Sequence, residues 1–304
     1  MHPKIKELLE IANSMPAISW EDFTPEDAKK SAILRAESAK ISNFDLEQVF
    51  EMTDHKVKHI PIRIYKPSAD PNLPIVIYFH GGGLMTGSIA GYDANCCYIV
   101  NRSNTIIISV DYRLTPEHKF PCAIEDAYEV LCWVSQNSEK IGGNSEKISV
   151  MGDSSGAYLA IVATLMAKDK GFPKIYSQIL LYPHTDANCN TESYQTHGQG
   201  FSLTANMMKW YFSHYQNTEE DLQNPYFSPL LAKNLANLPK ALILTAELDP
   251  LRDDGFLYAE KLKKFGVPVE YICYESMIHG FFKMPKWLES CRNMVAKIID
   301  FLQR

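Results

Sequence analysis

Short, continuous apolar runs recur along most of this chain and predict strands that are buried on both faces. The runs are four to six residues long and rich in Ile, Leu and Val; they lie at residues 75–79, 105–110, 148–151, 178–181, 241–245 and 269–273. Parallel strands that are covered on both sides have this pattern. Helical patterns fall between most of the runs, at 121–136, 157–168 and 255–265, and another closes the chain at 289–302. The alternation predicts an α/β fold, with a mostly parallel central sheet flanked by helices.

The first 66 residues follow other periods. The apolar positions of residues 1–16 are spaced as on one face of a helix; they are Ile5, Leu8, Leu9 and Ala12. Thr24 has the residue type of a helix cap, Pro25 suits the first helical position, and Asp27 completes an acidic first turn. A second helix is therefore expected to begin there. From residue 60 to 65, isoleucines alternate with other residues, which predicts a half-exposed strand.

Two segments, residues 1–45 and about 183–236, lack the rhythm of strands and helices. Both are rich in aromatic residues, Met, Asn and Ser, and the second contains no clear strand. We expect these two segments to form a helical cap over one end of the sheet. The sequence contains no internal repeat, low-complexity tract or flexible linker, so residues 1–304 are expected to form a single domain with an insertion.

Composition and charge narrow the classes of function. Hydrophobic residues make up 46% and charged residues 22% of the 304 residues, which is ordinary for a globular protein with a sizeable core. The net charge is −6 and no long run of Lys or Arg occurs, which argues against nucleic acid and anionic membranes as partners. A homodimer is left open.

Cysteine usage and the amino terminus predict a cytoplasmic location. The seven cysteines are odd in number, form no CxxC pair and in part lie inside apolar runs, as reduced thiols do. The first 15 residues are amphipathic rather than continuously apolar, unlike a signal peptide. The longest apolar runs are too short to span a bilayer, so no stable membrane insertion is expected.

A candidate nucleophile follows the third of the apolar runs. Gly152, Ser154 and Gly156 form the pattern GxSxG directly after the run at 148–151 and before a helical pattern. This strand–turn–helix context is where GxSxG holds a reactive serine, since the turn is so sharp that a Cβ at either glycine position would clash. The motif without that context is only suggestive. We therefore expect Ser154 to be exposed at the carboxyl end of a strand, as the nucleophile.

A second glycine-rich stretch, His80-Gly81-Gly82-Gly83, follows the run at 75–79. Consecutive glycines after a buried strand expose backbone N–H groups and let a substrate approach them closely. An oxyanion hole needs such donors, fixed where negative charge develops. The alternative is a flexible turn, and the presence of a nucleophile motif later in the chain favours the oxyanion hole.

A base and an acid for this serine follow the last two runs. His279 lies just beyond the run at 269–273, and Asp249 lies just beyond the run at 241–245. The order Ser154, Asp249, His279 is the one that the α/β-hydrolase topology produces. We predict that His279 is the general base and that Asp249 orients it.

These motifs identify a family resemblance. The chain resembles the hormone-sensitive-lipase-like carboxylesterases over roughly residues 60–304, in these stretches: HGGG at 80–83, DYRLTPEHKFPCAIED at 111–126, GDSSG at 152–156, DPLRDDG at 249–255 and IHGF at 278–281. The resemblance implies an α/β-hydrolase fold with a cap, the same triad, and an oxyanion hole formed by the N–H groups of Gly82, Gly83 and Ser155. Small departures stand beside these motifs, where the family usually has alanine or glycine; they are Ser155, Ala157, Glu247 and Ser276.

The favoured function is therefore a carboxylesterase that hydrolyses short-chain, small-molecule esters through an acyl-enzyme intermediate. An amidase or deacetylase would use the same triad. A ligand-binding receptor on the same fold, as in the plant gibberellin receptors, is disfavoured because those receptors lack the catalytic histidine and His279 is present. An interfacial lipase is disfavoured by the lack of a signal peptide.

Other candidate residues have structural explanations. The charges near Asp111–Arg113 and Glu125–Asp126 are expected to form buried ion pairs that brace loops. His55 and His59 lie in a strand-like region, where a metal site is improbable. His184 and Asp186 either line the pocket or serve only the loop in which they lie. The sequence carries no metal or cofactor fingerprint, so neither a metal nor a cofactor is expected.

Overall fold

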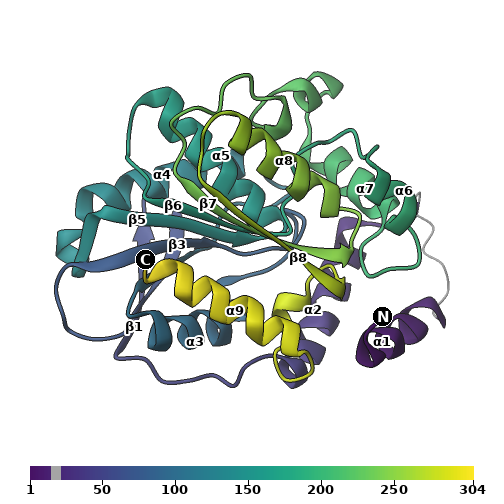
Figure 1. Ribbon diagram of the computed structural model, residues 1–304, viewed down its shortest axis with the longest axis horizontal. Helices are drawn as coiled ribbons and strands as arrows, with labels where there is room; N and C mark the ends of the chain where they lie inside the picture. Colours follow the sequence, from purple (N-terminus) through teal and green to yellow (C-terminus); the bar gives the residue numbers. More distant parts are fainter. Residues whose placement is uncertain (15–21) are drawn as a thin grey trace.

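The computed structural model describes residues 1–14 and 22–304 and contains one eight-stranded sheet in the order β1-β2-β4-β3-β5-β6-β7-β8 (Figure 1). The strands are β1 (Glu51–Val57), β2 (Ile60–Lys66), β3 (Leu73–Phe79), β4 (Ile106–Val110), β5 (Gly143–Asp153), β6 (Ser177–Leu181), β7 (Lys240–Leu248) and β8 (Val269–Ile278). Strands β1, β2 and β4 pair antiparallel, and the other pairs are parallel. The mostly parallel sheet that the sequence predicts is confirmed.

Helices cover both faces of the sheet and one end of it. The α-helices are α1 (Pro3–Ser14), α2 (Pro25–Ser42), α3 (Asp93–Ser103), α4 (Cys122–Asn137), α5 (Ser155–Lys170), α6 (Glu192–His197), α7 (Ala205–Tyr215), α8 (Arg252–Lys264) and α9 (Glu289–Leu302). Short 3-10 helices add η1 (Ile89–Tyr92), η2 (Glu139–Ile141), η3 (Glu219–Gln223), η4 (Pro229–Leu231) and η5 (Phe281–Lys283). None of the described helices is long and apolar enough to cross a membrane.

The alternation of side chains along a strand divides the core into two layers. On β3, Ile75 and Ile77 join the layer beneath α4, α5 and α8, whereas Val76 and Tyr78 join the layer beneath α3 and α9. Figure 1 shows these two groups of helices on opposite faces of the sheet. Because both faces are covered, the central strands β3 and β4 are apolar at nearly every position, as the sequence pattern indicates.

Helix α5 lies unusually close to the sheet. A Cβ on Gly156 would come within 1.9 Å of the carbonyl oxygen of Phe79, so this first turn packs directly against the end of β3. Residues 155–167 of the helix are all buried. The close contact fixes the junction of β5 and α5 beside the loop that follows β3.

The amino-terminal helices agree with the sequence in their main features. Helix α1 occupies most of the expected range 1–16; residues 15 and 16 and the side chain of Ala12 lie outside the described residues. At the start of α2, the Asp27 N–H donates to Thr24 Oγ1 at 3.2 Å, and the Thr24 N–H donates to Asp27 Oδ2 at 3.1 Å. This reciprocal pair is a capping box, and it confirms the predicted helix start.

Candidate active site

Ser154 lies at a strained turn between β5 and α5. Its φ and ψ are 55° and −121°, a backbone conformation that L-residues seldom adopt. The turn requires both flanking glycines, because a Cβ on Gly152 would come within 2.2 Å of the backbone of Gly156. The predicted strand–turn–helix context of GxSxG is therefore confirmed, and the turn lifts the Ser154 hydroxyl above the carboxyl edge of the sheet.

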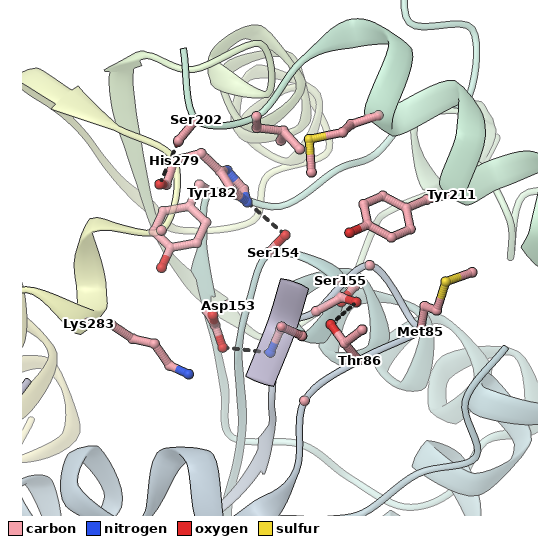
Figure 2. A pocket seen from close by; sticks show the side chains of 18 of the residues that line it. Met85, Thr86, Asp153, Ser154, Ser155, Tyr182, Ser202, Tyr211, His279 and Lys283 are labelled. Carbon is pink, nitrogen blue, oxygen red and sulfur yellow. Dashed lines mark hydrogen bonds between the residues drawn. The ribbon is translucent and has the colours of Figure 1, made fainter. Parts of the chain in front are cut away.

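The loops after β5, β7 and β8 bring Ser154, Asp249 and His279 into one hydrogen-bonded row. Figure 2 shows the His279 ring directed at the Ser154 hydroxyl. His279 Nε2 lies 2.9 Å from Ser154 Oγ, and His279 Nδ1 lies 2.7 Å from Asp249 Oδ2. Asp249 is fully buried, and its other oxygen accepts from the Leu251 N–H at 2.9 Å. A serine, a base and an orienting acid in this geometry suit nucleophilic attack on a carbonyl carbon.

Ser202, which no sequence pattern indicated, also contacts this row. Ser202 Oγ donates to the His279 carbonyl oxygen at 3.2 Å. Ser202 belongs to the segment between α6 and α7, so the insertion contacts the loop that carries the histidine. The two residues are 77 positions apart, and only the folded chain shows the connection.

The three N–H groups expected to bind an oxyanion lie beside Ser154. Gly82 and Gly83 follow β3 with φ of 139° and 65°, values at which a side chain would be strained. Thr86 fixes this loop, because its N–H and its hydroxyl both donate to the Gly82 carbonyl at 3.0 Å. Within residues 1–14 and 22–304, the N–H groups of Gly82, Gly83 and Ser155 donate to no protein acceptor, and all three residues line the cavity that contains Ser154.

Asp153 connects the glycine loop to the turn at Ser154. Its carboxylate is only 5% exposed and accepts three hydrogen bonds, from the Gly81 N–H at 2.9 Å, Tyr78 Oη at 2.6 Å and Tyr92 Oη at 2.9 Å. Burial raises the pKa of both tyrosines well above the usual range, so both hydroxyls remain donors. Figure 2 shows this carboxylate beneath Ser154. Sequence reasoning missed it, since the residue occupies a variable position of GxSxG.

The stretch at 111–126 supports the same loop. Tyr112 Oη donates to the His80 carbonyl at 2.6 Å, and the two rings stack with centroids 4.5 Å apart. Arg113 forms a bidentate pair with buried Asp126 at 2.7–3.0 Å, which confirms the predicted ion pair. His59 Nε2 also lies 3.1 Å from Asp126. No group of three or more His, Cys, Asp or Glu side chains in the described residues is placed to hold a metal.

The two candidates after β6 separate in the structure. His184 lines the cavity, 4% exposed, whereas Asp186 points to its own loop and accepts from the Asn188 N–H at 3.0 Å. Asp254 holds this loop, since its Oδ2 accepts from the Thr185 N–H at 2.7 Å and from the Asp186 N–H at 3.2 Å. Of the two alternatives, His184 lines the pocket and Asp186 serves its loop.

Asp254 is expected to make stability dependent on pH. Its complete burial raises its pKa from 3.8 to about 8. Between these values the folded chain binds more protons than the unfolded chain, so stability falls as the pH rises. Asp254→Asn keeps an acceptor for both N–H groups and removes the titration. The free energy of unfolding of wild type should therefore fall between pH 5 and pH 8 by up to about 4 kcal/mol more than that of the variant. Thermal unfolding at the two pH values measures this difference. An identical pH dependence of the two proteins would contradict the assignment.

Ser154 and His279 line a cavity of about 800 Å³. Its walls come from α1, α2, the loop at 81–88, the end of β6, the segment 202–215 and residues 278–287. Apart from the residues already described, most of the wall is apolar. A cavity of this size suits a small organic molecule.

Comparisons with known proteins find relatives that cover most of this chain. A family model for the alpha/beta hydrolase fold matches residues 76–283. The chain is 31% identical over 294 residues to an ethyl acetate hydrolase of Pseudomonas putida, covering 95% of this chain and 92% of that one. It is 36% identical over 258 residues to an arylesterase of Saccharolobus solfataricus, covering 83% and 84%. A hyperthermophilic esterase from the archaeon Pyrobaculum calidifontis superposes with a TM-score of 0.91 at 36% identity, covering 100% and 98%.

Proposed function

Because this chain belongs to the hormone-sensitive-lipase-like carboxylesterase family of the α/β-hydrolase superfamily and is a carboxylic ester hydrolase, we propose that it cleaves short-chain acyl esters through Ser154, His279 and Asp249. The observation that carries the proposal is the continuous row Asp249–His279–Ser154, with contacts of 2.7 and 2.9 Å, at the wall of a cavity. Small-molecule esters are the substrates that fit such a site.

In the proposed mechanism, His279 accepts the Ser154 proton at Nε2 as the hydroxyl oxygen attacks the ester carbonyl carbon. Asp249 holds the Nδ1–H tautomer and stabilises the imidazolium that forms. The carbonyl π electrons move to oxygen, and the tetrahedral intermediate collapses with loss of the alcohol, which takes its proton from His279. Water then attacks the acyl-serine by the same route and releases the acid.

The oxyanion is proposed to bind the N–H groups of Gly82, Gly83 and Ser155. Among the described residues these groups have no protein acceptor, and this supports the role, because N–H groups that are buried away from water are almost always paired. Donors that are fixed before the reaction stabilise developing charge without reorganisation. Asp153 is proposed to position them, since it anchors Gly81 at the start of the loop.

Residues 1–45 and about 183–236 are proposed to form the cap over the site. Side chains of these segments reach the cavity wall; they include Leu8, Leu9, Met207, Met208, Tyr211 and Phe212. Tyr211 lies directly on the glycine loop, because a Cβ on Gly83 would come within 2.7 Å of its ring. Trp210 instead packs on Phe23, with ring centroids 5.2 Å apart, so part of the aromatic cluster is internal packing of the cap.

This arrangement predicts a preference for short acyl groups. Tyr211 lies on the glycine loop beside Ser154, and we infer that a long acyl chain has to displace the side chains packed there. Among p-nitrophenyl esters, acetyl to hexanoyl are expected to be the best substrates, with kcat/KM at least about tenfold lower for dodecanoyl. The similarity to the ethyl acetate hydrolase of Pseudomonas putida supports a preference for short acyl groups. Steady-state kinetics across the series checks the prediction.

A truncation tests the contribution of α1 to substrate binding. Removal of residues 1–14 takes away Leu8 and Leu9 and is expected to raise KM, while a fluorophosphonate still labels Ser154.

Hydrolysis of emulsified long-chain triglyceride as fast as that of a dissolved short ester would contradict the short-chain preference. An amidase would share the triad, and the relative turnover of a matched ester and amide distinguishes the two.

A further inference from the structure

One polar side chain in the cavity wall has no role in the proposed chemistry. His184 follows β6 and lines the same cavity as Ser154 and His279. Only 4% of its surface is exposed to solvent. In the part of the chain that the structure describes, neither of its ring nitrogens has a hydrogen-bond partner. Its environment is aromatic: one face of the ring stacks on Tyr158 with centroids 4.4 Å apart and planes at 20°, and Phe212 lies at 5.3 Å edge-on.

The unpaired nitrogens of His184 open to the cavity. His80 provides a contrast, because its Nε2 is sealed inside the protein without a partner, whereas no nitrogen of His184 is sealed in that way. Packing against Tyr158 and Phe212 fixes the ring plane, so a molecule in the cavity meets the same nitrogens each time. Buried polar groups are nearly always hydrogen-bonded, and the missing partner of this imidazole is therefore to be found in the cavity.

The charge state of the ring limits what it binds. Burial, with a smaller contribution from His279, lowers the pKa of His184 to about 3, so the imidazole is neutral at physiological pH. A neutral imidazole has one N–H donor and one nitrogen acceptor. It brings no charge to balance a carboxylate, but it suits a hydroxyl, which donates or accepts, or a carbonyl oxygen, which accepts.

We propose that His184 is a specificity-determining residue that hydrogen-bonds an uncharged oxygen substituent of the substrate. The preferred substrates are esters that carry a hydroxyl or carbonyl oxygen in the group lying against Tyr158 and Phe212. An isosteric hydrocarbon group leaves the imidazole unpaired and stripped of water, which weakens binding in the transition state as well as in the ground state. This inference rests on the proposed esterase function and adds the class of substrate.

Matched ester pairs test it in the wild-type enzyme. Ethyl 3-hydroxybutyrate and ethyl 3-methylbutyrate differ by hydroxyl and methyl on the acyl side, and 2-hydroxyethyl butyrate and propyl butyrate differ likewise on the alcohol side. For one of the two pairs, kcat/KM is expected to favour the hydroxyl member by about tenfold, the effect of one buried hydrogen bond. Ratios near one for both pairs overturn the proposal, because a water molecule then satisfies His184 in every complex.

Variants separate hydrogen bonding from shape. His184→Phe removes both nitrogens and should bring the ratio for the favoured pair close to one, whereas His184→Gln, with a donor and an acceptor, should retain part of it. The control is Phe212→Leu, which alters the same wall without removing a polar atom and should change both members of a pair alike. A ratio in His184→Phe equal to that of wild type overturns the proposal. Circular dichroism verifies folding, and if His184→Phe does not fold, the wild-type ratio and His184→Gln decide.

These measurements distinguish the role of His184 from the proposed esterase function. If dissolved esters are hydrolysed but no pair shows a preference that depends on residue 184, the inference about the oxygen substituent is wrong and the esterase function stands. If no ester of either pair is hydrolysed, the proposed function itself is wrong.

Discussion

Ser154→Ala is expected to lower kcat for ester hydrolysis by about 10⁶ and to abolish labelling by a fluorophosphonate. The reason is that, in the described part of the chain, this hydroxyl alone lies 2.9 Å from His279 Nε2 and beside three N–H groups without a protein acceptor. Mass spectrometry of the labelled wild-type protein should place the adduct on the peptide containing Ser154. Residual hydrolysis above the rate in water would come from the oxyanion donors and from substrate binding.

Ser149→Ala provides a matched control for that experiment. Ser149 lies on the same strand, β5, and its hydroxyl is 2.7 Å from Ser177 Oγ, away from the row Asp249–His279–Ser154. This variant should label as wild type does. Labelling that persists in Ser154→Ala would remove Ser154 from the nucleophile role and direct attention to Ser155, whose buried hydroxyl has no partner in the described structure.

Asp249→Asn is expected to reduce kcat by about 10⁴ with the fold preserved. Asp249 Oδ2 accepts from His279 Nδ1 at 2.7 Å inside a fully buried site. An asparagine there lacks the charge that stabilises the imidazolium, and its NH₂ group favours the tautomer in which Nε2 carries the proton and is no longer a base. Steady-state turnover of p-nitrophenyl acetate, with circular dichroism as a check of folding, measures the loss.

Neighbouring carboxylates are not available to replace Asp249. Asp253 pairs with Arg252 Nε at 2.8 Å and accepts from the Ser193 N–H at 2.8 Å. Asp254 accepts from backbone N–H groups of the loop after β6. Asp253→Asn should accordingly keep kcat within a few-fold of wild type, because this carboxylate contacts Arg252 and Ser193 rather than His279. Near-normal turnover by Asp249→Asn would shift the acid role to one of these residues.

The sequence was informative wherever a local pattern decides the structure. Buried parallel strands must be apolar on both faces, so the runs at 75–79 and 148–151 mark β3 and β5 without further information. The turn at Ser154 has one stringent steric requirement, a pair of glycines, and both glycines lie within the five consecutive residues of the motif. The chain order of serine, acid and base follows from the topology once the strands are located.

Elements without such a pattern were missed. Strand β1 is a sheet edge with mostly exposed residues, so its sequence, Glu51–Val57, has no apolar face to recognise. Helix α3 (Asp93–Ser103) buries Asn95 and two cysteines among its contacts, which obscures its apolar stripe. The spatial order of strands, with β4 between β2 and β3, is likewise absent from the linear pattern.

Tertiary structure alone decided which polar groups meet. Asp153 becomes an anchor for the glycine loop because Tyr78, Tyr92 and Gly81 converge on it from positions more than 60 residues away. Among the described residues His184 has no hydrogen-bond partner, because its ring packs against aromatic rings from α5 and α7. A local pattern fixes φ, ψ and the buried face of an element. The partners of a buried polar side chain depend on how distant elements pack, and it is that packing, through burial and hydrogen bonding, that sets its charge and its chemistry.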